Sequence, residues 1–157
     1  MHTPHIIIAG GGIAGLASAL ALGRHDALIL EQAEAFSSIG AGLQLGPNAV
    51  RALQKLGAWD AVEPITSSPP EIHMRDGVSG KLLKRLQLGK NFESRYGAPY
   101  RVAHRADLHA ALLSVVKSRP NITMRLNEKI SSVDVHLDGL TLKSNAKPMT
   151  AIMQISH

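Results

Sequence analysis

A glycine-rich turn between two apolar runs constrains the fold of this chain most. The run from His5 to Ala9 and the run from Ala27 to Leu30 are short, continuous and apolar, which is typical of buried parallel strands. Gly10-Gly11-Gly12 ends the first run, and the segment from Ile13 to Gly23 has the apolar spacing of a helix. Strand, helix and strand in this order predict a βαβ unit of a parallel sheet.

The glycines of this turn form the pattern G-x-G-x-x-G. Gly10 permits a tight turn, Gly12 leaves room for a pyrophosphate against the backbone, and Gly15 lets helix and strand pack closely. Glu31 ends the second strand 21 residues after Gly10, where an acid accepts from a ribose hydroxyl and repels a ribose phosphate. The combination predicts dinucleotide binding without separating FAD from NAD. The alternative is a tight turn followed by an ordinary surface glutamate.

The rest of the chain indicates a mixed α/β architecture. A Ser- and Gly-rich loop is expected over 37–46, and Pro47 suits the first turn of a helix that stops near Gly57. Asp76-Gly77 predicts the turn of a β-hairpin over about 71–87. The remaining expected elements are turns over 65–70, a loop before a helix over 105–118, strands over 122–126, 130–137 and 140–142, and a turn at Asp138-Gly139. We therefore predict one incomplete domain over 1–144 and an irregular tail over 145–157.

Composition excludes several function classes. The 157 residues are 45% hydrophobic and 18% charged, the balance of one globular domain, and they include no cysteine. Disulfides and thiol chemistry are thereby excluded, and a reducing cytoplasm is favoured. The net charge of +5 comes from scattered Lys and Arg, so we expect no nucleic acid as partner. No apolar run is long enough for a membrane helix, and the histidines form no metal-binding pair.

Three segments resemble the flavoprotein aromatic hydroxylases, the group that includes salicylate hydroxylase and para-hydroxybenzoate hydroxylase. They are Ile7 to Leu16 with Leu30-Glu31-Gln32, then Ile39 to Val50, then Tyr100 to Leu108. The segment from Ile39 to Val50 is the most specific and resembles the salicylate hydroxylase branch. The resemblance implies a partial Rossmann-like FAD-binding domain with a hairpin insertion and antiparallel strands. It also implies FAD as cofactor, NADH or NADPH as electron donor and a small aromatic substrate, and it leaves the oligomeric state open.

The resemblance also implies roles for individual residues. Gly10, Gly12, Ala14 and Gly15 would line the pyrophosphate turn, and Glu31 would bind the adenosine ribose. Gly42, Leu43 and Gln44 would lie along the flavin. Arg105 would reach the cofactor phosphate or ribityl chain, and the backbone near Ile130 would meet the adenine. The plain alternatives are an exposed loop amide for Gln44 and a surface ion pair with Asp107 for Arg105. No side chain is assigned as a catalytic acid or base.

The chain departs from the family pattern at two places. The link from Gly23 to His25 is about two residues shorter than the family's helix-to-strand turn, which bears on where Glu31 lies. The family's later Asp-Gly motif and Gly-Asp segment are absent, and the sequence after Ser144 does not resemble what should follow. We therefore expect a truncated monooxygenase portion that is inactive alone. Two alternatives stay open, a non-catalytic remnant with weak nucleotide binding and an NAD-binding dehydrogenase module.

Overall fold

The chain folds into two compact units. The computed structural model describes residues 6–36, 41–136, 139–145 and 148–152. The first unit combines residues 1–38 with 112–157, and the second comprises residues 39–111. The chain leaves the first unit after residue 38 and returns to it at residue 112, within a helix. Among the described residues, no helix is both long and apolar enough to cross a bilayer.

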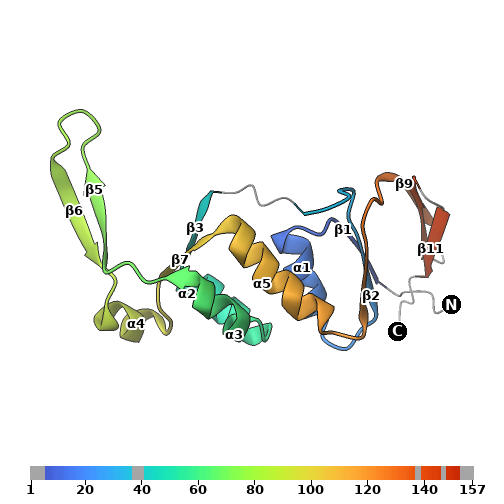
Figure 1. The fold of residues 1–157 in the computed structure, drawn as a ribbon, viewed down its shortest axis with the longest axis horizontal. Coiled ribbons are helices and arrows are strands. Elements are labelled where there is room, and N and C mark those ends of the chain that lie inside the picture. The colour runs from blue at the N-terminus through green and yellow to red at the C-terminus, as the bar shows by residue number, and fades with distance from the viewer. Residues whose placement is uncertain (1–5, 37–40, 137–138, 146–147, 153–157) are drawn as a thin grey trace. The chain divides into compact units, whose positions relative to one another are not determined.

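A parallel sheet forms the centre of the first unit (Figure 1). Its elements are strand β1 (Ile6–Ala9), helix α1 (Ile13–Ala21), strand β2 (Ala27–Leu30), the second half of helix α5 (Arg105–Lys117) and strand β8 (Ile122–Arg125). The strand order is β1-β2-β8, and all four residues of the central strand β2 are buried. Continuous apolar runs of this kind are what a parallel sheet requires. The predicted βαβ unit is thereby confirmed, with β1 and β2 paired in parallel from Ile6–Ala27 to Ala9–Leu30.

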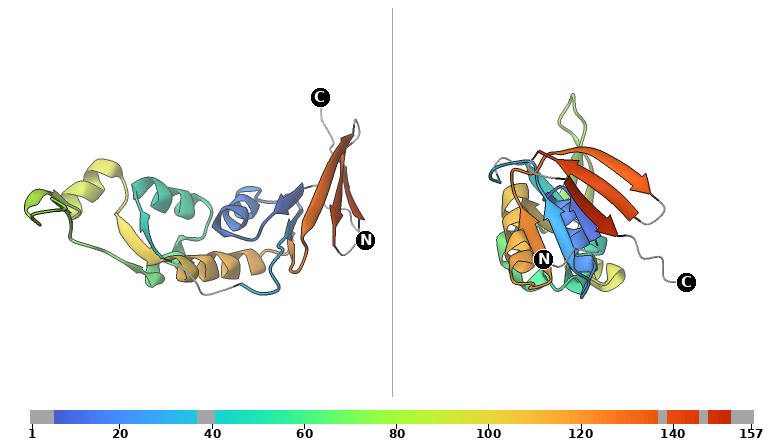
Figure 2. Two further views of the ribbon diagram at one scale, coloured as in Figure 1. Left: turned by 90° about the horizontal axis from the view of Figure 1, so that it is seen from above. Right: turned by 90° about the vertical axis from the view of Figure 1, so that its right-hand side faces the viewer.

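A second, antiparallel sheet belongs to the same unit. Its strands are β9 (Ile130–His136), β10 (Gly139–Ser144) and β11 (Pro148–Ile152), in the order β11-β10-β9. Leu142 of β10 packs with Leu28 and Leu30 of β2, and Ile130 and Leu140 pack against this cluster. Figure 2 shows the three strands side by side at the red end of the colour scale. The leucine contacts therefore fix this sheet on β2.

The structure contains a strand where the sequence predicts an irregular tail. Residues 148–152 form β11 and pair with β10 from Gly139–Ile152 to Lys143–Pro148. If the outer edge of β10 were unpaired, a row of its backbone N–H and C=O groups would lack hydrogen-bond partners. Strand β11 supplies these partners. The helical and strand periodicities of the sequence do not reveal this pairing. The residues after 152, and Asp138 of the predicted turn, lie outside the described residues.

The second unit contains a small antiparallel sheet, several short helices and a hairpin. Its sheet has the order β3-β7-β4. Its elements are β3 (Gly42–Leu45), α2 (Pro47–Lys55), α3 (Trp59–Val62), the 3₁₀ helix η1 (Glu63–Ile65), β4 (Thr66–Ser67), β5 (Glu71–Arg75), β6 (Leu82–Gln87), α4 (Lys90–Tyr96), β7 (Arg101–His104) and the start of α5. The predicted hairpin is confirmed as the pair β5–β6. The predicted helix after Pro47 is confirmed as α2, with Val50 and Leu53 buried.

Two parts of the second unit differ from the sequence prediction. The predicted loop over 37–46 contains strand β3, and the predicted loop before Arg105 contains helix α4 and strand β7. Strand β3 pairs with β7, from Gly42–His104 to Leu45–Arg101. The two strands lie about sixty residues apart in sequence, so the residues around one strand do not indicate that the other pairs with it. Glycine inside β3 further weakens the strand signal there.

Candidate functional site

The glycine turn of the first unit is fixed by one hydrogen bond and one close approach. The Gly10 N–H donates to the Leu30 carbonyl oxygen at 2.7 Å, which joins the end of β1 to the end of β2. Gly10 has φ of 99°, a region that favours glycine. A Cβ on Gly15 would lie 1.9 Å from the Gly10 carbonyl oxygen. Gly15 is therefore required for packing α1 against the turn, as the fingerprint predicts.

Among the described residues, the position directly before helix α1 leaves room for a ligand atom. Gly12 is the residue before the helix, with φ of −72° and ψ of −179°, and a Cβ placed on it would meet nothing within 4 Å. The first turn of α1 carries no acidic residue and no side chain caps it. The N–H groups of Ile13 and exposed Ala14 begin the helix at its positive end, next to this open position at Gly12. This arrangement suits a diphosphate group, because its oxygens accept from such N–H groups.

Glu31 lies directly against the glycine turn. One carboxylate oxygen accepts from the Gly11 N–H at 2.7 Å and the other accepts from the Ala33 N–H at 2.9 Å. The short Gly23–His25 link does not displace Glu31, since β1 and β2 keep an unbroken register. A carboxylate offers only acceptors, which is the chemistry that ribose hydroxyl donors require.

Gly11 is a constrained position that the sequence pattern leaves unassigned. A Cβ placed on it would lie 3.0 Å from the ring of Phe36 and 3.3 Å from Cβ of Glu31. Gly11 itself is buried. The run of three glycines is the signal that points to it, because a third glycine exceeds what the G-x-G-x-x-G pattern needs.

One pocket of the first unit unites three of the predicted residues. It measures about 240 Å³ and is lined by Gly10, Glu31 and Ile130, together with Ala9, Leu30, Gln32 and Glu128. The pocket lies at the carboxyl ends of β1 and β2, the edge at which ligands bind in parallel α/β sheets. Glu128 is the unexpected member, because it lies two positions before Ile130 and no sequence motif marks its own side chain as a site residue.

The other predicted residues lie in the second unit. Gly42, Leu43 and Gln44 form most of strand β3, and the Gln44 side chain is exposed. Arg105 is the first residue of α5, and its backbone N–H donates to the Ala41 carbonyl oxygen at 3.1 Å. Gly42 also lines a pocket of about 330 Å³ with Ile65, Ser67, Val102, Ala103, His104 and Asp107.

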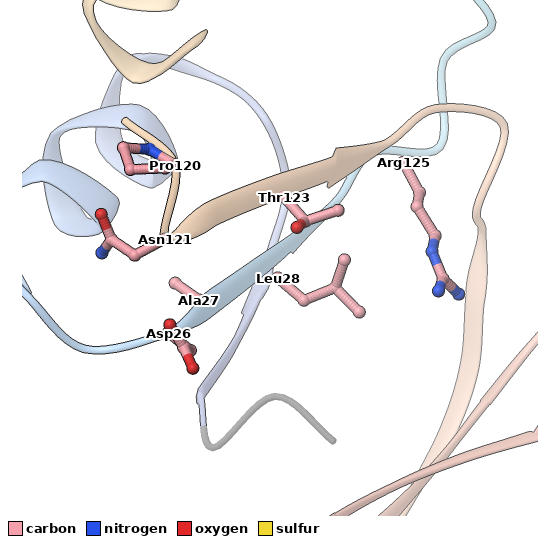
Figure 3. A pocket seen from close by; sticks show the side chains of 7 residues that line it. All are labelled: Asp26, Ala27, Leu28, Pro120, Asn121, Thr123 and Arg125. Atoms are coloured by element: carbon pink, nitrogen blue, oxygen red, sulfur yellow. The ribbon is translucent and has the colours of Figure 1, made fainter. Parts of the chain in front are cut away.

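A further pocket of the first unit, of about 250 Å³, runs along β2 and β8 (Figure 3). Its polar lining residues are Asp26, Asn121, Thr123 and Arg125. The Asn121 side-chain amide donates to the carbonyl oxygens of Gly23 and His25, so this residue closes the α1–β2 turn. Asp26 and Asn121 lie at the amino ends of their strands, opposite the edge that binds ligands in such sheets. We therefore do not assign the nucleotide to this pocket.

Within the described part of the chain, no group of three or more His, Asp or Glu side chains is placed to hold a metal ion. The candidate site consists of backbone N–H groups, the room left by glycines that lack a side chain, and the carboxylates of Glu31 and Glu128. These are the elements of a nucleotide site.

Known proteins similar to this chain include hydroxylases and monooxygenases, as their names state. No protein-family model matches the chain. It is 36% identical over 138 residues to 3-hydroxybenzoate 6-hydroxylase of Klebsiella oxytoca, which covers 87% of this chain and 35% of the relative. It is 34% identical over 141 residues to the FAD-dependent monooxygenase OpS4 of Beauveria bassiana, covering 88% of this chain and 32% of that protein. The chain thus spans about a third of the length of these relatives.

Solved structures agree in fold. The p-nitrophenol 4-monooxygenase PnpA of Pseudomonas putida matches with a TM-score of 0.82 at 20% identity, over 95% of this chain and 38% of that one. The 2-methyl-3-hydroxypyridine-5-carboxylic acid oxygenase matches with a TM-score of 0.79 at 27% identity, over 96% of this chain and 38% of that one. By sequence and by fold, the chain therefore belongs with the amino-terminal part of the flavoprotein aromatic hydroxylases, as its three motif segments predict.

Proposed function

We propose that this chain binds FAD and holds the ADP half of the cofactor in the pocket that Gly10, Glu31 and Ile130 line. The observation that carries the proposal is the open space over Gly12 at the start of α1, beside a carboxylate fixed on the same turn. The backbone N–H groups of Ile13 and Ala14 would hold the diphosphate, and Glu31 would hold the ribose. A ribose phosphate would meet the negative charge of Glu31, so the site favours an unphosphorylated ribose.

We further propose that the chain provides the amino-terminal FAD-binding part of an FAD-dependent aromatic-ring monooxygenase. The relatives act on hydroxybenzoate and on related small aromatic compounds, as their names state. FAD would supply the oxygen chemistry, with NADH or NADPH as electron donor. In the second unit, Gly42 to Gln44 are the residues proposed to lie along the flavin, and the guanidinium of Arg105 suits a phosphate oxygen or ribityl hydroxyl. The absence of cysteine favours the cytoplasm as the place of action.

A matched pair of glycine substitutions tests the binding proposal. Gly12 and Gly89 both precede a helix with an extended backbone, at φ of −72° and −77°, and a Cβ on either meets nothing within 4 Å. Gly12→Ala should keep the unfolding midpoint of the unmodified chain and lower its affinity for FAD and ADP at least tenfold, because the methyl group occupies the diphosphate's space. Gly89→Ala should change neither property.

Titration calorimetry with FAD, ADP and NAD measures the outcome. The unmodified chain should bind FAD and ADP. An unmodified chain that is folded and binds neither would overturn the proposal. Stronger retention of NAD than of FAD would favour a dehydrogenase module instead.

A further inference from the structure

A second glutamate, Glu128, lines the proposed nucleotide pocket. This residue is only 8% exposed, although glutamate is almost never so deeply buried without a partner. It lines the same pocket as Gly10 and Glu31. Burying a charged group is costly unless hydrogen bonds compensate, so its presence in this pocket needs a physical account.

Hydrogen bonds place Glu128 beside the ribose-binding residue of the proposed site. The Glu128 N–H donates to the Glu31 carbonyl oxygen at 2.8 Å, which fastens the two residues together through the backbone. Glu128 precedes Ile130, another lining residue, by two positions. If the diphosphate lies at Gly12 and the ribose at Glu31, as proposed, Glu128 and Ile130 would border the part of the pocket left for the base.

A clamp formed by Ser144 and Asn145 holds the Glu128 segment in place. The Ser144 hydroxyl donates to one carboxylate oxygen of Glu128. The side-chain oxygen of Asn145 accepts from the Lys129 N–H at 2.9 Å, and its side-chain NH₂ donates to the Asn127 carbonyl oxygen at 3.0 Å. The backbone N–H of Asn145 donates to the Lys129 carbonyl oxygen at 3.1 Å. These bonds hold the segment although Asn127 has a left-handed φ of 56°. The Glu128 carboxylate is therefore a fixed group rather than a mobile surface acid.

Resting on the proposed function, we propose that Glu128 recognises the exocyclic amine of adenine and makes the pocket selective for 6-aminopurines. An ionised carboxylate offers only acceptors, and the Ser144 hydroxyl uses one of about four lone-pair sites. The 6-amino group of adenine donates to such an oxygen. Hypoxanthine presents a carbonyl oxygen at the same position, so two acceptors would face each other. A hydrogen bond to a charged group corresponds to a preference of roughly ten- to a hundredfold.

Titration calorimetry of the whole 157-residue chain with ADP and with IDP tests this selectivity. The unmodified chain should bind ADP roughly ten- to a hundredfold more tightly than IDP. Glu128→Gln, whose amide offers a donor as well as an acceptor, should bring the two affinities within about threefold of each other. Glu128→Asp keeps the charge, withdraws the carboxylate by one methylene group and should also weaken the preference, which provides a second variant if the first does not fold.

The outcomes separate this inference from the proposed function. Equal affinities of the unmodified chain for ADP and IDP would overturn the role of Glu128 and leave nucleotide binding intact. An unchanged ADP preference in folded Glu128→Gln would assign the selectivity to the backbone near Ile130 and would also overturn it. Binding of neither nucleotide by the unmodified, folded chain would remove the proposed function and this inference together.

Discussion

The glycine turn of the first unit and the β5–β6 hairpin of the second use similar local chemistry in different surroundings. Glu31 accepts from the N–H groups of Gly11 and Ala33 in a half-buried setting, and its bond to Gly11 joins residues twenty positions apart. Asp76 accepts from the N–H groups of Val78 and Ser79 and from the Ser79 hydroxyl, all within three positions and exposed. The first carboxylate ties the turn between β1 and α1 to the segment after β2, whereas the second only shapes a hairpin turn. Paired substitutions in the two regions should therefore differ in size.

Glycine replacements should give the largest difference. Gly15→Ala places a methyl group 1.9 Å from the Gly10 carbonyl oxygen, an overlap with backbone that only a shift of α1 relieves. We expect a loss of about 3 kcal/mol or more in the free energy of unfolding, at or above the upper end of ordinary overpacking. Gly77→Ala in the hairpin meets nothing within 4 Å and should leave stability nearly unchanged. Urea unfolding followed by circular dichroism measures both, and equal midpoints for the two variants would refute the assigned role of Gly15.

The same comparison shows which features a sequence can reveal. The β1–α1–β2 unit was predictable because each signal is local and all agree: an apolar run, three glycines, helical spacing, and an acid after the second run. The hairpin was predictable for the same reason, from Asp76-Gly77 between two strand-like runs. In both regions the residues that determine the structure lie within about thirty positions of one another.

Features that depend on distant partners were not predictable. The sequence predicts a loop where strand β3 forms, because the hydrogen-bond partner β7 lies about sixty residues later. The sequence does not identify Glu128 as a site residue, because hydrogen bonds with Glu31 and Ser144 hold it in the pocket wall. No spacing rule connects these residues. Strand β11 was missed because the edge of β10 decides its conformation more than its own composition does.

Carboxylate replacements should give the next largest difference. In Glu31→Gln the side-chain NH₂ must face either the Gly11 or the Ala33 N–H, so one half-buried donor loses its acceptor. We expect a loss of roughly 1–3 kcal/mol in the free energy of unfolding, together with weaker ADP binding. Asp76→Asn should lower the unfolding midpoint only slightly, because its amide oxygen still accepts from the Val78 and Ser79 N–H groups and the turn is exposed. Urea unfolding with ADP titration checks the pair, and a larger effect at Asp76 would contradict the comparison.

Trimming apolar side chains should give a smaller but still measurable contrast. Ile29 in β2 is fully buried, so Ile29→Val removes one methylene group from the core and should cost about 1 kcal/mol. Leu83 in β6 is 64% exposed, and Leu83→Ala should change stability by less than about 0.5 kcal/mol although it removes more atoms. Thermal and urea unfolding of the two variants give the comparison. A larger loss for Leu83→Ala would mean that another surface covers the hairpin in solution.

Acid titration of the hairpin should give the smallest effect, confined to the turn. Hydrogen bonds from the Ser79 N–H, the Ser79 hydroxyl and the Val78 N–H hold the pKa of Asp76 below its ordinary value. The stabilisation is therefore fully present above the ordinary aspartate pKa and is lost as the pH falls through the lower, folded-state value. Amide shifts of Val78 and Ser79 in NMR spectra should follow that transition, and Asp76→Asn should abolish it. A midpoint at or above the ordinary aspartate value would show that these three bonds do not persist in solution. Because they span only three positions, the turn should loosen on protonation while β1, α1 and β2 keep their amide shifts.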